Sequence, residues 1–250
     1  MLSRLDQKSL ALVRQIGALA DESGMRAYLV GGPVRDLALK IPSTDLDITV
    51  EGEGMRLAGL FAAEHAGAKT VRYPAFKTAT VFLPNGRVVD FATARKETYA
   101  RPGALPSVTA SVLRDDLFRR DFTINAMAVA LNAAAWGKIR DPFNGRADVR
   151  SKKIRVLHHK SFIDDPTRVL RAARFAGRLR FTVASRTLKL LKEAVRAKAL
   201  DALKVQRYSK ELDKILKEDD PALTLGYLKA WGVKRPAAPC GRHVIEYAIE

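Results

Sequence analysis

The chain has 250 residues, of which 47% are hydrophobic and 28% are charged, and its formal net charge is +17 at pH 7. That length supports one large domain or two small ones with a buried core and no disulfide staples. The single cysteine, Cys240, cannot form an internal disulfide, and no apolar run approaches the roughly 18 residues that cross a bilayer. Residues 1–17 carry charges every few positions and lack the apolar core of a signal peptide. These features argue against membrane-spanning and disulfide-rich secreted classes, and they predict a cytoplasmic protein.

The positive charge is concentrated in one part of the chain. Residues 150–217 hold 20 basic and 6 acidic side chains, whereas residues 1–149 hold 20 and 16. A regional excess of this kind is typical of a surface that binds a polyanion. Nucleic acid is favoured over an anionic membrane as the partner, because no amphipathic helix with exposed aromatic residues is evident.

The hydrophobic pattern predicts strands early in the chain and helices late. In chain order, the predicted elements are a helix over 5–20, a strand over 27–32 that ends at a glycine pair, a short helix from Pro33, a strand over 44–52, a helix over 54–66, strands over 69–73, 78–83 and 87–93, and a loop over 94–111. From Val112 onward the pattern is mostly helical, with a break at 141–145. This order predicts an α+β head followed by a helical part, with a boundary around 141–150.

Paired carboxylates occur in the predicted strand over 44–52. Asp45 and Asp47 are two residues apart, so their side chains point to the same face of a strand. Two neighbouring carboxylates repel each other unless a cation joins them, and Mg²⁺ prefers oxygen ligands shared with phosphates. The alternative is a chance pair on a surface strand. Asp90, in a neighbouring predicted strand, is a third candidate for the same site; its alternative is a solvent-facing residue on an edge strand.

A glycine pair precedes these carboxylates. Backbone N–H groups at Gly31 and Gly32, followed by a helix N-terminus, can form a cradle for an anion, and Arg35 lies just beyond them. The alternatives are a plain tight turn for the glycines and a surface ion pair with Asp36 or another neighbour for Arg35.

Two later segments combine arginines with hydrogen-bonding side chains. In 117–131, Arg119, Arg120, Asp121 and Asn125 accompany an apolar run. Arginine grips phosphate with two bonds, and Asp and Asn can bond ribose hydroxyls; Asp121 could instead be a helix N-cap.

The second of these segments covers 161–181. Asp165 suits a cap and Pro166 the first turn of a helix. One face of that helix carries a row of arginines: Arg168, Arg171, Arg174 and Arg178. The opposite side is apolar, at Val169, Ala172, Ala173, Ala176 and Leu179. The row has no acid among its members, which favours an external anion as its partner; the alternative is a solvated basic face.

Taken in order, these motifs resemble class II tRNA nucleotidyltransferases, the family of CCA-adding enzymes and bacterial poly(A) polymerases. The resemblance lies in LVGGPVRD (29–36), DLDI (45–48), RRDFTINAMA (119–128), DPFNG (141–145) and DDPTRVLRAARF (164–175), which span most of residues 27–181. It implies an α+β, polymerase-β-like nucleotidyltransferase head with a small antiparallel or mixed sheet over 1–145. A helical neck, which selects the nucleotide and binds RNA, is implied over 146–250.

The resemblance also implies roles for individual residues. Gly32 and Arg35 contact the triphosphate, Asp45 and Asp47 bind Mg²⁺, and Arg120 and Asp121 hold the phosphate or sugar of the nucleotide. Asp165, Arg168, Arg171 and Arg174 form the helix that selects the nucleotide and holds phosphate. Residues 94–111 correspond to the family's flexible segment, which is linked to the switch from C to A addition.

The chain departs from the family pattern in three ways. Asp164 stands where Glu is common, Asn144 stands where a second Gly is common, and few residues follow the neck, whereas members usually continue with domains that grip the tRNA.

The expected activity is Mg²⁺-dependent transfer of C and A from CTP and ATP to a tRNA 3′ end without a nucleic-acid template. Cytosine and adenine both present an amine donor beside a ring-nitrogen acceptor. Asp165 can accept from the amine and Arg168 can donate to the ring nitrogen. The alternatives are an enzyme that adds only A, only C, or poly(A), and, less favoured, a non-catalytic RNA-binding module.

Overall fold

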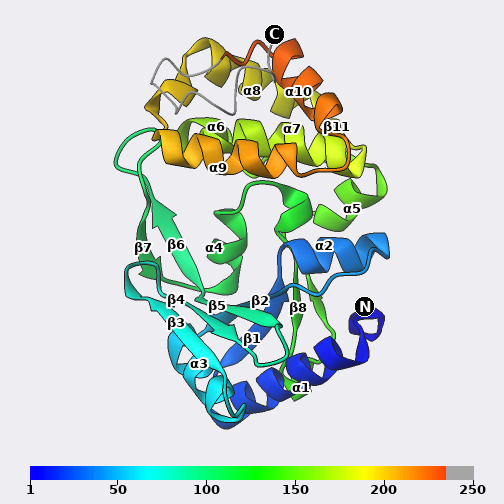
Figure 1. Cartoon of the computed structure of the whole chain (residues 1–250), viewed down its shortest axis with the longest axis vertical. Helices are drawn as coiled ribbons and strands as arrows, with labels where there is room; N and C mark the ends of the chain where they lie inside the picture. Colours follow the sequence, from blue (N-terminus) through cyan, green and yellow to red (C-terminus); the bar gives the residue numbers. More distant parts are fainter. Residues whose placement is uncertain (235–250) are drawn as a thin grey trace. The chain divides into compact units, whose positions relative to one another are not determined.

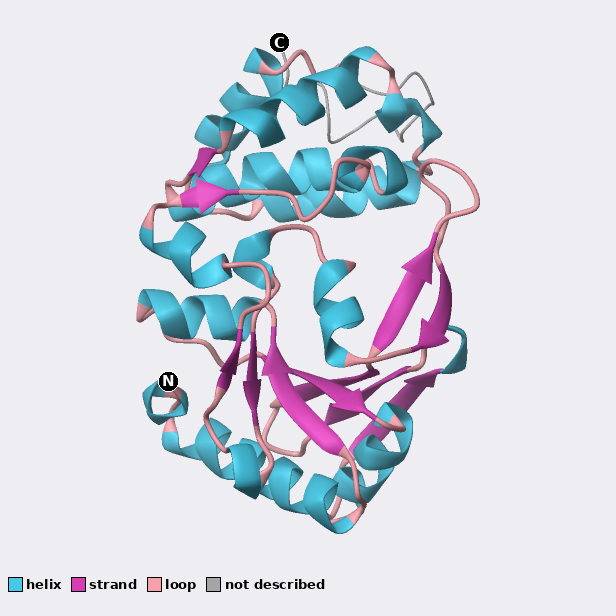
Figure 2. Ribbon diagram, turned by 180° about the vertical axis from the view of Figure 1, so that it is seen from behind, coloured by secondary structure: helices cyan, strands magenta, loops and turns pink. Residues whose placement is uncertain are grey.

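The computed structural model describes residues 1–234 (Figures 1 and 2). Cys240 and the rest of 235–250, the end of the predicted neck, lie outside the described residues. The chain divides into two compact units, the first formed by Met1–Thr98 and Val108–Val149, the second by Tyr99–Ser107 and the chain from Arg150 onward. In the described part of the chain, no helix has the length and apolar character needed to span a bilayer.

The first unit is built on a seven-stranded mixed sheet with the order β3-β4-β5-β2-β1-β8-β9. Its strands are β1 (Arg26–Val30), β2 (Leu46–Glu51), β3 (Lys69–Tyr73), β4 (Thr78–Phe82), β5 (Val88–Thr93), β8 (Ala128–Ala130) and β9 (Ile139–Arg140). All neighbouring strands are antiparallel except β2 and β5, which are parallel. This arrangement confirms the predicted α+β head with a mixed sheet.

Helices cover both faces of this sheet (Figure 1). Helices α1 (Gln7–Glu22) and α3 (Gly54–Ala63) lie on one face, and α2 (Gly32–Leu39) and α4 (Leu113–Phe118) lie on the other. Helix α1 begins at Asp6, whose carboxylate accepts a hydrogen bond from the backbone N–H of Ser9 at 3.0 Å. It buries one stripe of side chains, Leu12, Val13, Ile16, Leu19 and Ala20, because apolar residues recur at helical spacing.

Two predictions about the first unit were wrong. The segment 94–111, predicted as a loop, contains strands β6 (Arg95–Thr98) and β7 (Ser107–Ala110), which pair with each other as a separate ribbon. The segment from Val112, predicted to be mostly helical, contains strands β8 and β9. Strand β8 is fully buried, and a short apolar run cannot be assigned to a buried strand or a buried helix by periodicity alone.

The second unit is helical, as predicted. It comprises α6 (Ser161–Asp164), α7 (Thr167–Leu179), α8 (Ser185–Arg196), α9 (Val205–Leu216) and α10 (Pro221–Ala230), with a small parallel pair, β10 (Lys153–Ile154) and β11 (Thr182–Val183). Helix α5 (Gly145–Arg150) precedes them. Helix α7 packs against α9 and α10, and ten of its first eleven residues, all but Arg171, are buried. The arginine face of α7 is therefore buried at Arg168 and Arg174, half-buried at Arg171 and exposed at Arg178.

Close packing of α1 on the sheet requires a glycine. A Cβ atom at Gly17 would collide with the backbone carbonyl of Leu131, directly after β8. We expect Gly17→Ala to lower the free energy of unfolding by about 1–3 kcal/mol, because the backbone must move to admit the methyl group. Gly226→Ala, at an exposed position of α10, is the matched control: no described atom lies within 4 Å of the added Cβ, and helix propensity favours alanine by roughly 1 kcal/mol. Chemical denaturation measures both changes, and equal effects would contradict this packing account.

Candidate active site

Three aspartates gather where β2 and β5 begin. Asp47 and Asp90 are register partners in the parallel β2–β5 pair, so their side chains leave the sheet on the same face. Asp45 lies just before β2, two residues from Asp47. Strand β5 lies between β4 and β2, so the alternative that Asp90 sits on an edge strand is wrong, whereas the expectation that it faces solvent is correct, because Asp90 is exposed. The Asp90 carboxylate accepts a hydrogen bond from the hydroxyl of Thr80 on β4.

The pKa of Asp47 reflects its burial and the other charges nearby. Burial raises the pKa of Asp47 to about 6; Arg120 and Arg35 oppose that shift, while Asp90 and Asp45 add to it. A partly buried carboxylate beside two others is stabilised in its charged form by a cation. The donor set fits Mg²⁺, which takes one or two carboxylates and completes its shell with phosphate and water oxygens. Within 1–234, no three His, Cys, Asp or Glu side chains form a ready-made metal cluster.

The glycine pair lies directly beside this cluster. Gly31 has φ 75°, a conformation that side chains other than glycine rarely adopt, and it immediately precedes α2. A Cβ atom there would stand 2.7 Å from Nη1 of Arg120 and 3.6 Å from Oδ2 of Asp47. The structure thus brings Gly31, Asp47 and Arg120 together at the N-terminus of α2, where backbone N–H groups and a guanidinium suit an anion.

Arg120 is fixed by an acid that sequence reasoning missed. Asp116 on α4 is fully buried and accepts from Arg120 at 3.0 Å and from Arg119 at 2.7 Å. Burial acts to raise the pKa of Asp116, but the two guanidiniums outweigh it and lower that pKa. The spacing of Asp116 and Arg120, four residues apart, was the available signal, because such pairs meet on a helix.

A second buried network lies beneath the start of α2. Nε of Arg35 donates to Asp36 at 2.8 Å, and Nη1 of Arg35 donates to the side-chain oxygen of Asn125 at 2.7 Å. Asn125 in turn donates to Asp121 at 3.0 Å, and Asp121 also accepts from the N–H of Phe122. The pair with Asp36 exists, but Arg35 is only 3% exposed, so it is not a surface ion pair. A Cβ atom at Gly32 would lie 3.7 Å from Nη2 of Arg35.

Within the second unit, Asp165 precedes α7 and is tightly held. Its Oδ1 accepts from the N–H of Thr167 at 3.1 Å, from the hydroxyl of Thr167 at 2.6 Å and from Arg207 at 2.9 Å. Helix α7 begins at Thr167, with Pro166 at its N-cap position, so Asp165 supports the first turn from one residue earlier than predicted. Arg168 is 4% exposed and donates to the hydroxyl of Ser161 at 2.6 Å.

The arginine row of α7 has acidic partners on another element. Arg171 lies 3.5 Å from Glu211 of α9, and Arg174 lies 3.2 Å from Glu218, directly after α9. Arg178, the last of the row, is exposed. The inference that the row needs an external anion because it contains no acid is therefore wrong for Arg171 and Arg174, since a helix more than 30 residues later supplies the carboxylates.

Residues 27–155 match the family model described as the poly A polymerase head domain. The chain belongs to this family. The matched range includes every predicted site residue of the first unit, which we call the head from here on. Asp165, Arg168, Arg171 and Arg174 lie beyond it.

Relatives extend the likeness into the second unit. The chain is 42% identical over 235 residues to an A-adding tRNA nucleotidyltransferase of Geobacter sulfurreducens, covering 94% of this chain and 27% of the relative. It is 38% identical to a CC-adding tRNA nucleotidyltransferase of Deinococcus radiodurans, covering 82% of this chain and 53% of the relative. The structure of the Thermotoga maritima CCA-adding enzyme complexed with tRNA is similar, with TM-score 0.81 and 42% identity over 92% of this chain and 52% of that one. The chain thus spans between about a quarter and about half of the length of these proteins.

Proposed function

We propose that this protein is a template-independent tRNA nucleotidyltransferase that adds C, A or both from CTP and ATP to the tRNA 3′ end. One observation carries the proposal: Asp47 and Asp90 stand in register on the same face of the sheet, beside the anion cradle of Gly31 and Arg120. Carboxylates for a metal and donors for a phosphate are the two requirements of phosphoryl transfer. A protein that only binds RNA has no need for paired carboxylates at such a place.

In the proposed reaction, the 3′ hydroxyl of the RNA attacks the α-phosphate of the nucleotide and pyrophosphate leaves. Asp45 and Asp47 hold Mg²⁺, with Asp90 as a third carboxylate beside them. When bound, Mg²⁺ lowers the pKa of the hydroxyl and neutralises charge that develops at phosphorus. The N–H group at Gly32 and the Arg120 guanidinium bind triphosphate oxygens. The N–H of Gly31, expected from the sequence to take part in the cradle, instead donates to the carbonyl of Met127 at 3.2 Å.

The buried network beneath α2 gives the remaining head residues their proposed roles. Arg35 places positive charge under the glycine turn, and Asn125 and Asp121 fix that charge in position. By the family resemblance, Arg35 contacts the triphosphate and Asp121 the nucleotide's phosphate or sugar; both contacts remain predictions.

Asp165 and Arg168 are proposed to read the base. Oδ1 of Asp165 is engaged by Thr167 and Arg207, which leaves Oδ2 to accept the exocyclic amine of C or A. Arg168 supplies the donor for the ring nitrogen. Arg171 and Arg174 supply further positive charge for phosphate along the same helix. Their ion pairs with Glu211 and Glu218 neutralise part of that charge.

Arg207 is a positioning residue in this scheme. We expect Arg207→Ala to reduce kcat/KM for ATP and CTP by about 10- to 100-fold, because small displacements of a substrate-orienting group have effects of that size. Arg207→Lys keeps the charge and one donor, so partial recovery is expected. Initial rates at several nucleotide concentrations test this, and a loss that appears only in kcat, with KM unchanged, would argue for a purely structural role.

Transfer assays decide among the related activities. Labelled CTP and ATP are offered separately with tRNAs that end before CCA, after C and after CC. Addition of C and A identifies a complete CCA enzyme; addition of A alone after CC, or of C alone, identifies the partial activities. A long A tail identifies a poly(A) polymerase. RNA binding without any transfer, at saturating Mg²⁺, would overturn the proposed activity and favour a binding module.

We further propose a catalytic head over 1–145 and a helical neck over 146–250, in a cytoplasmic protein. The support for the boundary is the helical composition of the second unit and the basic excess of 150–217. The predicted partners are the tRNA 3′ end, CTP and ATP, and no binding to a membrane is predicted.

A further inference from the structure

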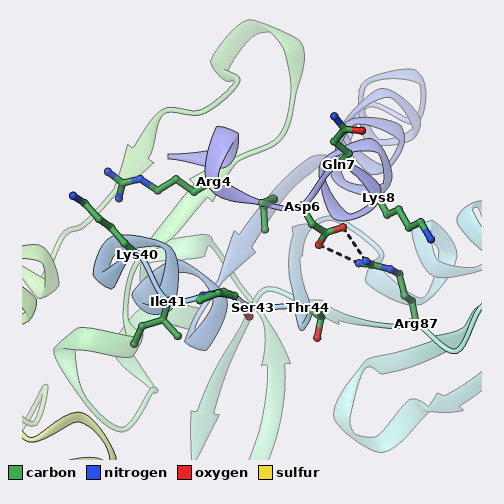
Figure 3. Close-up of a pocket in the computed structure, with 11 residues that line it drawn as sticks. Arg4, Asp6, Gln7, Lys8, Lys40, Ile41, Ser43, Thr44 and Arg87 are labelled. Carbon is green, nitrogen blue, oxygen red and sulfur yellow. Dashed lines mark hydrogen bonds and ion pairs between the residues drawn. The ribbon is translucent and has the colours of Figure 1, made fainter.

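A cavity of about 860 Å³ opens on the head beside the start of β2 and β5 (Figure 3). One wall is the turn that leads into α1, residues 4–8. The other is the connection from α2 to β2, residues 40–44, and Arg87 closes the remaining side at the start of β5. Thr44, on the cavity rim, is the residue immediately before Asp45. The cavity therefore adjoins the carboxylates proposed to hold Mg²⁺, one residue along the chain.

The cavity is strongly basic. Four cationic side chains line it against a single carboxylate, that of Asp6. Arg87 forms an ion pair with this carboxylate at 2.8 Å, and the carboxylate also accepts hydrogen bonds from the N–H and the hydroxyl of Ser9. The remaining three cations, Arg4, Lys8 and Lys40, form no ion pair with any residue of 1–234; Arg4 donates to the backbone carbonyl of Leu37. Like charges around one cavity repel each other, so an anion placed among them is favoured.

The cations are spread along the cavity rather than gathered at one point. Arg4 and Lys40 extend at one end, whereas Lys8 and Arg87 lie at the other (Figure 3). Ser43 and Thr44 lie between them, and the apolar residues Ile41 and Pro42 also line the cavity. A single phosphate fits one end only. A chain of phosphates joined by riboses matches both ends and uses the hydroxyl and apolar surface in between.

We propose that this cavity binds the RNA backbone just upstream of the reacting 3′ hydroxyl. The inference rests on the proposed function for the position of that hydroxyl, at Asp45 and Asp47. RNA that delivers its 3′ end there passes over the adjoining rim at Thr44 and along the cavity, where Lys40 at one end and Lys8 at the other meet its phosphates. The head then holds the primer directly, in addition to any contact with the basic residues 150–217.

The test compares two double variants of the full chain. The pair K8Q/K40Q removes two cavity lysines, and the pair K69Q/K138Q removes two exposed lysines elsewhere on the head, at β3 and before β9. Both pairs make the same change in composition and charge. Binding of a fluorescent single-stranded RNA is measured by anisotropy from 50 to 200 mM salt. We expect the slope of log K against log salt to become shallower by about 1.4 in K8Q/K40Q, at roughly 0.7 per phosphate contact, and to stay unchanged in K69Q/K138Q.

Other measurements separate the possible ligands. In single-turnover transfer, K8Q/K40Q should need more RNA for half-maximal rate, with the half-saturating ATP concentration and the maximal rate unchanged. Equal slopes in the two double variants would overturn the proposal, and so would weakened ATP binding with normal RNA binding, which would assign the cavity to the triphosphate. If the parent protein transfers no nucleotide, the proposed activity fails, but the difference in salt slopes still decides whether the cavity binds RNA.

Discussion

Asp47→Asn is expected to abolish nucleotide transfer, to leave RNA affinity nearly unchanged, and to stabilise the metal-free protein at pH 8. Transfer fails because an amide does not replace a carboxylate between Mg²⁺ and the nucleotide. RNA affinity persists because it comes mainly from basic side chains. Wild-type turnover in this variant would remove Asp47 from the metal site. Asp213→Asn, at an exposed position of α9, is the matched control and should behave like the parent.

The stability effect follows from the raised pKa of Asp47. The folded protein holds this proton up to about pH 6, whereas the unfolded chain releases it near the ordinary aspartate pKa of 3.8. The folded state is therefore favoured at low pH, and this contribution is lost as the pH rises from about 4 through 6. The loss at pH 8 is roughly 2–3 kcal/mol, since one pKa unit corresponds to about 1.4 kcal/mol. Thermal unfolding at pH 5 and pH 8 measures it. Mg²⁺ should raise the Tm of the parent at pH 8 and not that of Asp47→Asn.

Arg168→Ala is expected to change which nucleotides are accepted. Incorporation of C and A should fall, and the rates with UTP and GTP relative to ATP should rise by at least about 30-fold. The guanidinium both donates to a ring nitrogen and rejects a ring N–H, and a mismatch of that kind is worth about 2–4 kcal/mol. Asp165→Ala should shift the ratios in the same direction. Single-turnover rates with all four nucleotides on one tRNA primer provide the comparison.

A control separates base reading from local packing. Ser161→Ala removes the hydroxyl that accepts from Arg168 but keeps the guanidinium. If the nucleotide ratios depend on Arg168 itself, Ser161→Ala shifts them far less than Arg168→Ala does. Unchanged ratios in Arg168→Ala and Asp165→Ala, with only activity or stability lost, would refute the base-reading role and leave a phosphate contact and a helix cap.

The sequence predicted the strands of the head where alternation was clear. Strands β1 to β5 were each placed to within two residues, because β-branched runs were separated by glycine turns. It could not predict which strands are neighbours: Asp90 meets Asp47 only because β5 pairs with β2 across an intervening helix and hairpin. Strand β8 was not predicted from the sequence, because a short, fully buried apolar run has no periodicity that distinguishes a strand from a helix.

The sequence likewise could not predict contacts between side chains that are distant along the chain. The sequence shows no acid within the arginine row of α7, because Glu211 comes from α9 and Glu218 from the segment after α9. Arg207 reaches Asp165 from the same helix as Glu211. Asp116 lies four residues before Arg120, a spacing at which side chains meet on a helix, but it stands just outside the segment 117–131 that the sequence pattern singled out. The local sequence pattern identifies which functional side chains a site contains. The tertiary structure decides which of those side chains already have a hydrogen-bond or ion-pair partner within the protein.

The in-register pair of Asp47 and Asp90 also restricts how this region can vary by insertion and deletion. Successive side chains of a strand alternate between faces, so one residue added inside β5 before Asp90 would turn its carboxylate toward α3. Two added residues would restore the face but move the carboxylate along the strand, away from Asp47. The connections that tolerate length changes are therefore those outside the paired segments. The tight turn at Asn85 and Gly86, between β4 and β5, is one such connection.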